Sequence, residues 1–130
     1  AYRDALAILP EDESTITKKG KDNKHFSDAG ANKISNAFMT PVKEKIVTQE
    51  QRQLAFDVQE TTDDHGMHVT GLVQDQNGTK YFIVKNSWGK TNQCDGNFFA
   101  SFPYVRYKTM NILVHKDALS KNIKKKIGIK

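Results

Sequence analysis

The sequence predicts an α+β fold in which helices flank an antiparallel sheet. Two β-rich runs, residues 67–74 and 80–85, flank Asn77 and Gly78. An Asn-Gly pair between such runs is the strongest short-range signal for a β-hairpin, because both residues tolerate the positive φ angles of a tight turn. Helix-capping patterns occur on either side of these runs. We therefore expect a sheet in the middle of the chain, with a helix before it and a helix after it.

The sequence predicts that residues 1–46 form a divergent lead-in segment of helix and loop. Residues 2–9 are apolar enough for a short helix that ends at Pro10. Residues 11–23 are charged and polar, which favours an exposed loop. Residues 28–38 carry apolar side chains at loosely helical spacing and predict a second helix. None of these segments contains a chemical motif.

Residues 47–130 form the rest of one predicted lobe. Thr48 and Gln51 match a capping box, and Leu54, Ala55 and Phe56 would give the following helix an apolar side. After the hairpin, the order of polar and apolar residues predicts a polar loop and three short elements. These are a polar loop over 89–96, a strand over 97–101, a helical turn over 103–107 and a strand over 109–115.

Asp117 is the predicted cap of a last helix that includes Leu119, Ile123 and Ile127 and ends at Gly128.

Composition limits the function classes. The chain has 130 residues and a formal net charge of +5, to which lysines near both ends contribute. No aromatic platform, zinc-finger spacing or helix-turn-helix pattern accompanies these lysines, so we expect a solvated basic face and no nucleic-acid partner. No apolar run is long enough to span a bilayer, and we expect no membrane partner. The single cysteine, Cys94, excludes an internal disulfide framework.

His65 and Asn86 are the candidate site residues. His65 precedes the first strand of the hairpin and Asn86 follows the second. Because antiparallel pairing brings these two ends together, we expect the side chains to meet. An amide carbonyl that holds one imidazole nitrogen leaves the other nitrogen oriented for proton exchange with a nucleophile. Taken alone, His65 would be an ordinary surface histidine and Asn86 an ordinary turn residue.

The motifs around these residues resemble those of papain-like cysteine peptidases. His-Gly-Met at 65–67 and Asn-Ser-Trp-Gly at 86–89 are similar to the histidine and asparagine segments of that family. The segments 52–57, 60–67 and 111–119 resemble the bleomycin hydrolase and aminopeptidase C branch. The resemblance covers residues 47–130, and the residues before it are too divergent to place.

The resemblance implies a catalytic role for each motif residue. His65 would act as general base and acid, and Asn86 would orient its ring. Trp88 would shield their hydrogen bond from water, a role that is compatible with its being an ordinary core aromatic. In the family the nucleophilic Cys precedes the His, whereas Cys94 follows Asn86 in a loop without a helix amino terminus beneath it. We therefore expect Cys94 to be structural, the nucleophile to lie on a missing amino-terminal segment, and the chain to be the carboxy-terminal portion of a larger, two-lobed protein.

The resemblance further implies an aminopeptidase that acts on peptide substrates, without a metal or organic cofactor, as a homohexamer. Residues 128–130 would lie in the cleft, where the terminal carboxylate captures the substrate amine. It implies a cytoplasmic protein, although export is also open. The rival hypothesis is a non-catalytic papain-like module for binding or assembly.

A metal site is the remaining alternative for the His65 region. Asp63, Asp64, His65 and His68 have side chains that suit zinc or manganese. Residues three apart on a strand point to opposite faces, so His65 and His68 should diverge. We therefore expect no metal site, and we expect His25, His68 and His115 to be polar residues without a chemical role.

Overall fold

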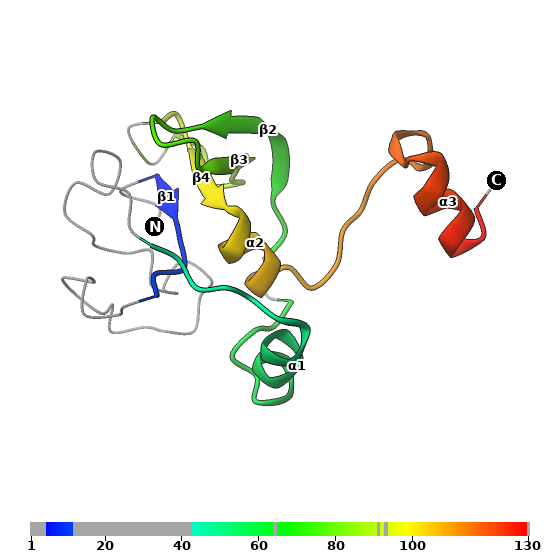
Figure 1. Cartoon of the computed structure of the whole chain (residues 1–130). Coiled ribbons are helices and arrows are strands. Elements are labelled where there is room, and N and C mark those ends of the chain that lie inside the picture. Colours follow the sequence, from blue (N-terminus) through cyan, green and yellow to red (C-terminus); the bar gives the residue numbers. More distant parts are fainter. Residues whose placement is uncertain (1–4, 12–42, 64, 91, 93, 130) are drawn as a thin grey trace.

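The computed structural model describes residues 5–11, 43–63, 65–90, 92 and 94–129. These residues form an α+β fold, as the sequence predicts, built on a four-stranded mixed sheet with strand order β1-β4-β3-β2. Two helices lie beside the sheet, and a third lies away from it at the end of an extended linker (Figure 1). The predicted 28–38 helix lies outside the described residues. So do His25, Asp64 and all but one residue of the predicted 11–23 loop.

The hairpin that holds the candidate site is confirmed. Strands β2 (His68–Gln74) and β3 (Lys80–Lys85) pair antiparallel. The Asp75 carboxylate accepts hydrogen bonds from the backbone N–H groups of Asn77 and Thr79, at 2.9 and 2.8 Å. Gly78 has a φ of +86°, a conformation that favours glycine. Local side-chain bonds and one glycine therefore fix the register of the hairpin.

Strand β4 (Asn97–Ser101) pairs antiparallel with β3, and β1 (Leu6–Ala7) pairs parallel with β4. Strand β4 has the predicted bounds. The predicted helix over 2–9 is wrong for its described part, because residues 5–9 are all buried and include a strand. A continuously buried apolar run suits a strand that is covered on both faces better than an amphipathic helix.

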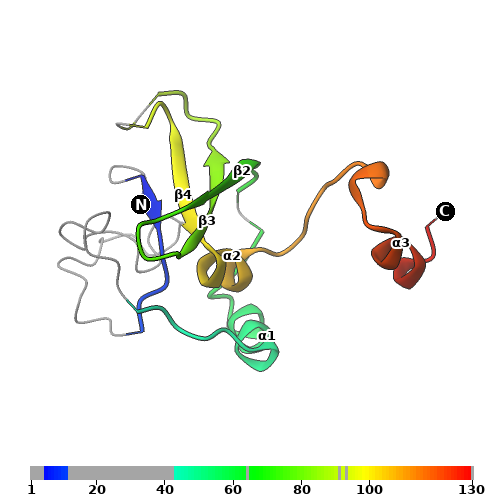
Figure 2. The ribbon, with the colours of Figure 1, turned by 45° about the horizontal axis from the view of Figure 1, so that its top comes forward.

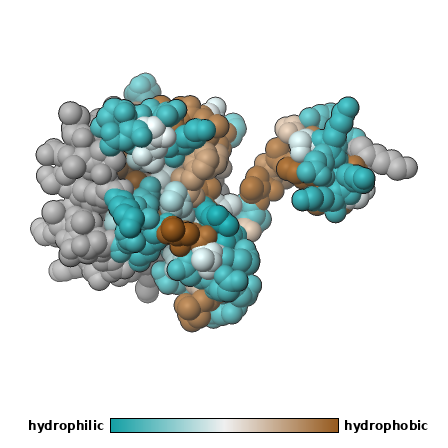
Figure 3. Space-filling model, viewed as in Figure 1, coloured by the Kyte–Doolittle hydropathy of each residue, from teal (hydrophilic) through white to brown (hydrophobic). Residues whose placement is uncertain are grey.

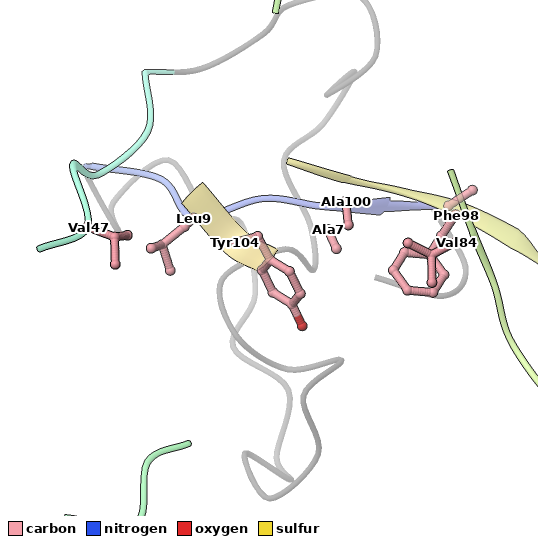
Figure 4. Close-up of a cluster of buried hydrophobic side chains, with 8 residues drawn as sticks. Ala7, Leu9, Val47, Val84, Phe98, Ala100 and Tyr104 are labelled. Carbon is pink, nitrogen blue, oxygen red and sulfur yellow. The ribbon is translucent and has the colours of Figure 1, made fainter. Parts of the chain in front are cut away.

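The main core lies where β1, β3, β4 and α2 meet (Figure 4). Phe98 is 1% exposed and is the largest of the fully buried side chains among the described residues. It belongs to one cluster with Val84, Ala100, Tyr104 and residues of the amino-terminal segment. Residues 5–9 are thus an integral part of the lobe and not a lead-in to it.

Glu44 connects the amino-terminal segment to the end of β4. Its carboxylate accepts a hydrogen bond from the Leu9 backbone N–H at 2.7 Å and another from the Ser101 hydroxyl. Burial raises the pKa of the Glu44 carboxyl, and the two hydrogen bonds oppose this effect. Burial likewise raises the pKa of Tyr81 to about 12, with a contribution from the nearby Asp75 carboxylate.

Helix α1 (Gln49–Asp57) begins with the predicted capping box between Thr48 and Gln51. Its Arg52 guanidinium donates hydrogen bonds to the backbone carbonyls of Arg106 and Thr109. The apolar side expected from Leu54, Ala55 and Phe56 is buried only in part, because Ala55 is buried whereas Leu54 and Phe56 are not. They are 62% and 52% exposed, and Ala55 is the buried residue of the helix.

Helix α2 (Phe102–Lys108) confirms the helical turn predicted over 103–107. The predicted strand over 109–115 is wrong, because these residues form an extended linker without a ladder partner among the described residues (Figure 2). A short 3-10 helix, η3 (Lys116–Ala118), follows the linker.

The last helix, α3 (Lys121–Ile127), is capped by Ser120 and not by Asp117. It ends as predicted at Gly128, whose φ is +72°. Ser120 caps the helix because Asp117 itself lies within η3, and Leu119 lies before the helix. No helix in the described ranges is both long and apolar enough to cross a membrane.

Candidate active site

The open end of the hairpin brings together the two residues that the sequence singles out. His68 pairs with Lys85 in the last register position of β2 and β3. Asn86 follows Lys85 directly, and His65 lies three residues before His68. Asn86 is 3% exposed, and His65 is partly buried. The predicted meeting of the two side chains is confirmed, since His65 Nε2 lies 2.9 Å from Asn86 Oδ1.

A second contact determines which atom of the His65–Asn86 pair carries the hydrogen. The Ser87 backbone N–H donates to Asn86 Oδ1 at 2.7 Å. A backbone N–H requires an acceptor, so the amide oxygen and not the amide nitrogen must occupy this position. His65 Nε2 therefore donates to the same oxygen. In a neutral imidazole ring the lone pair is then on Nδ1, which is the tautomer that a proton-accepting base needs.

This orientation of the Asn86 amide costs free energy at the amide nitrogen. Asn86 Nδ2 is buried and has no hydrogen-bond partner among the described residues. An unsatisfied buried donor costs on the order of 1–3 kcal/mol. Such exceptions are rare in folded proteins and gather where function outweighs stability. An acceptor from outside the described part of the chain would remove the cost.

Trp88 lies against the imidazole of His65. The ring centroids are 5.4 Å apart and the rings are tilted by 47°. The expectation that Trp88 is an ordinary core aromatic is wrong, because its side chain is 51% exposed. The indole ring therefore contacts the site histidine while part of it remains open to solvent.

The 89–96 loop behind Asn86 depends on a residue that the sequence analysis missed. Asn92 Oδ1 accepts hydrogen bonds from the backbone N–H groups of Cys94 and Gly96, and Asn92 Nδ2 donates to the Asn97 carbonyl at 2.8 Å. The Gly96 carbonyl in turn accepts from the Asn86 backbone N–H at 3.2 Å. Asn92 thus connects the loop to the site. The Asp95-Gly96 dipeptide was the available turn signal.

Cys94 is placed by the same loop. It packs against the main buried cluster, as does Met67. Its backbone carbonyl accepts hydrogen bonds from the backbone and side-chain N–H groups of Asn97. These contacts suit a packing role for Cys94.

The remaining candidate residues do not gather into a site. Among the described residues, no group of three or more His, Cys, Asp or Glu side chains could hold a metal ion. His68 is exposed at the start of β2. His115 is exposed and accepts a hydrogen bond from the Asp117 backbone N–H, which caps η3. Both are polar residues of the surface, as expected.

Comparison with known families gives a match over most of the chain. Residues 15–129 match the peptidase C1-like family. The chain belongs to this family. The match begins well before residue 47, so it also includes much of the segment that the sequence resemblance could not place. A search of curated proteins finds no match. Membership identifies the chain as papain-like, a class whose peptidases use a cysteine nucleophile with a histidine base.

Proposed function

We propose that this chain provides the base of a Cys-His-Asn peptidase site. His65 would take the proton of a cysteine thiol, form a thiolate–imidazolium pair, and later protonate the leaving amine. Asn86 would hold the ring, and Trp88 would limit the access of water to their hydrogen bond. The observation that carries the proposal is the contact between His65 Nε2 and Asn86 Oδ1, with Ser87 fixing the amide orientation.

The nucleophile of the proposed reaction is a cysteine on another segment. Cys94 is the only cysteine of this sequence, and its partly buried position against the core does not suit attack on a substrate. We therefore propose that an amino-terminal segment or lobe of the whole protein supplies the thiol. The amide nitrogen of Asn86, which has no partner among the described residues, is a donor that such a segment would satisfy.

Substrate and assembly follow from the resemblance to the bleomycin hydrolase and aminopeptidase C branch. We propose an aminopeptidase that acts on peptides with a free amino terminus and assembles as a homohexamer. Residues 128–130 would enter the cleft to bind the substrate amine. Because α3 lies away from the sheet (Figure 1), this role requires a movement about the 109–115 linker.

The experiment is irreversible labelling with an epoxide that is directed at papain-like thiols, applied to the protein purified from its natural source. Intact-mass spectrometry under denaturing conditions then identifies the labelled polypeptide. Label on a cysteine of another segment or chain supports the proposal. Label on Cys94 refutes the assignment of the nucleophile. The absence of label favours the rival hypothesis of a non-catalytic module for binding or assembly.

Variants test the roles of individual residues in the same assay. We expect His65→Ala to slow labelling by at least about 100-fold, the lower end of what a general base contributes. Asn86→Ala should slow it less, since the ring remains but loses its orientation. His68→Ala is the matched control, because His68 is exposed three residues away and should leave the rate unchanged.

A further inference from the structure

The 89–96 loop joins β3 to β4 and contacts the candidate site where it returns to the sheet. The ladder between the two strands ends at Lys85 and Asn97. One further bond continues it, because the Asn86 backbone N–H donates to the Gly96 carbonyl at 3.2 Å. The side chain of Asn86 is the one that contacts the site imidazole. The position of the Gly96 carbonyl therefore helps to determine where the Asn86 amide lies.

Hydrogen bonds, more than apolar contacts, determine the conformation of this loop. Apart from Cys94, residues 89–96 include no apolar side chain. The exposed hydrophobic surface in Figure 3 belongs instead to α1 and to the linker that leads to α3. Asp95 and Gly96 both have a positive φ, of +54° and +78°. Left-handed backbone is unfavourable for a residue with a Cβ atom, so specific contacts must hold Asp95 in this conformation.

Asn92 supplies such contacts from inside the loop. Its Oδ1 accepts hydrogen bonds from the backbone N–H groups of Cys94 and Gly96, at 2.9 and 3.0 Å. Its Nδ2 donates to the Asn97 carbonyl at 2.8 Å. Two of these bonds flank the peptide group between Gly96 and Asn97, because one involves the N–H before this group and the other the carbonyl after it. The carbonyl of the flanked peptide group is the acceptor for the Asn86 N–H.

We propose that Asn92 is a positioning residue for the site imidazole. Asn92 fixes the Gly96 peptide group, and this group holds the backbone of Asn86. The amide oxygen of Asn86 in turn orients the ring of His65. The inference rests on the proposed function, in which His65 is the base of a Cys-His-Asn site. An imidazole that is already oriented reacts faster with a thiol, because less ordering remains for the reaction step.

The first measurement is the rate at which the ring N–H of His65 exchanges with solvent, followed by NMR in the 130-residue chain. This proton lies on Nε2 and is bonded to Asn86 Oδ1, which should slow its exchange. We expect Asn92→Ala to speed the exchange about tenfold, the effect of about one hydrogen bond. Asn92→Asp keeps an acceptor for the two N–H groups and removes only the donor, so it should speed the exchange about threefold.

The second measurement is the rate of epoxide labelling in the whole protein. Asn92→Ala should slow labelling about tenfold, because the ring of His65 is retained but is less well oriented. This effect is smaller than the loss of at least about 100-fold expected for His65→Ala. Asn92→Asp should again lie between the native protein and Asn92→Ala.

Asp75→Ala is the matched control, because Asp75 also accepts hydrogen bonds from two backbone N–H groups of a turn. That turn joins β2 to β3 and lies at the end of β3 away from the 89–96 loop (Figure 2). Asp75→Ala should lower the free energy of unfolding in urea, as Asn92→Ala does. It should leave the His65 ring exchange and the labelling rate unchanged, so it separates positioning from stability.

The outcomes distinguish this inference from the proposed function. Unchanged ring exchange in either Asn92 variant, or the same acceleration in Asp75→Ala, would overturn the positioning role of Asn92. Labelling of the native protein that Asn92→Ala does not slow would also overturn it. Ring exchange that changes as expected, in a whole protein that the epoxide does not label, would support the hold of Asn92 on His65 and refute the proposed thiol chemistry.

Discussion

Gly96→Ala tests whether the loop behind Asn86 depends on close contact between backbones. Gly96 has a φ of +78°, and a Cβ atom built on it would lie 2.8 Å from the Gly89 carbonyl carbon and closer still to its oxygen. Real Cβ atoms essentially never approach a neighbour within 3.0 Å. The two loop strands must therefore separate, and the Asn86 N–H bond to the Gly96 carbonyl lies at the point of separation.

The expected cost is the sum of three terms. Left-handed backbone costs an alanine about 1–2 kcal/mol relative to glycine. Overpacking of a tight contact adds about 1–3 kcal/mol. Loss of the Asn86 backbone bond adds about 1 kcal/mol. We therefore expect Gly96→Ala to lower the free energy of unfolding by roughly 3–6 kcal/mol, a large share of the stability of a small domain.

Gly89→Ala is the matched control, because it shares the backbone conformation but not the contact. Gly89 has a φ of +72°, and no atom lies within 4 Å of a Cβ atom built on it. Gly89→Ala should therefore lower the free energy of unfolding only by the conformational term, about 1–2 kcal/mol. Urea unfolding followed by circular dichroism measures both variants. Equal costs for the two substitutions would refute the argument that the close contact at Gly96 holds the loop.

Two further predictions concern stability. Glu44 has a raised pKa in the folded protein, so its contribution to stability is present below its unfolded pKa and is lost as pH rises through the higher folded value. Glu44→Gln should therefore gain stability relative to the native chain as pH rises from about 4, near the ordinary pKa of a glutamate, toward neutral pH. The same difference in unfolding free energy between the two proteins at both ends of this range would contradict the argument. Trp88→Ala should cost less than about 1.5 kcal/mol, against about 3–5 kcal/mol for Phe98→Ala, because Trp88 is half exposed and Phe98 is buried. If urea unfolding showed that Trp88→Ala and Phe98→Ala lower the free energy of unfolding equally, Trp88 would have to be covered in solution.

The parts of the fold that the sequence predicts are those that short-range chemistry determines. The hairpin depends on Asp75 and Gly78, and the start of α1 depends on Thr48, each acting on residues no more than four positions away. The meeting of His65 and Asn86 follows from the hairpin register alone. These features need no knowledge of the rest of the chain.

The sequence predictions are wrong where the strand that a segment would pair with lies far away along the chain or is absent among the described residues. Residues 5–9 are buried and include strand β1 because β1 pairs with β4, more than 90 residues later, and local sequence contains no trace of that partner. The 109–115 segment has the composition of a strand but finds no ladder among the described residues. Apolar content alone does not decide burial, as Leu54 on α1 also shows.

The site itself combines both kinds of determinant. His65, Asn86 and Ser87 are held by the hairpin and its adjoining loop, so the base of the proposed site is oriented without any contribution from a nucleophile. A thiol from another segment would meet an imidazole whose tautomer is already fixed, and its arrival would cost little further ordering. Among the described residues, the Asn86 amide nitrogen still lacks an acceptor. Under the proposed function, this chain would thus keep its base preorganised for a thiol that a second segment supplies.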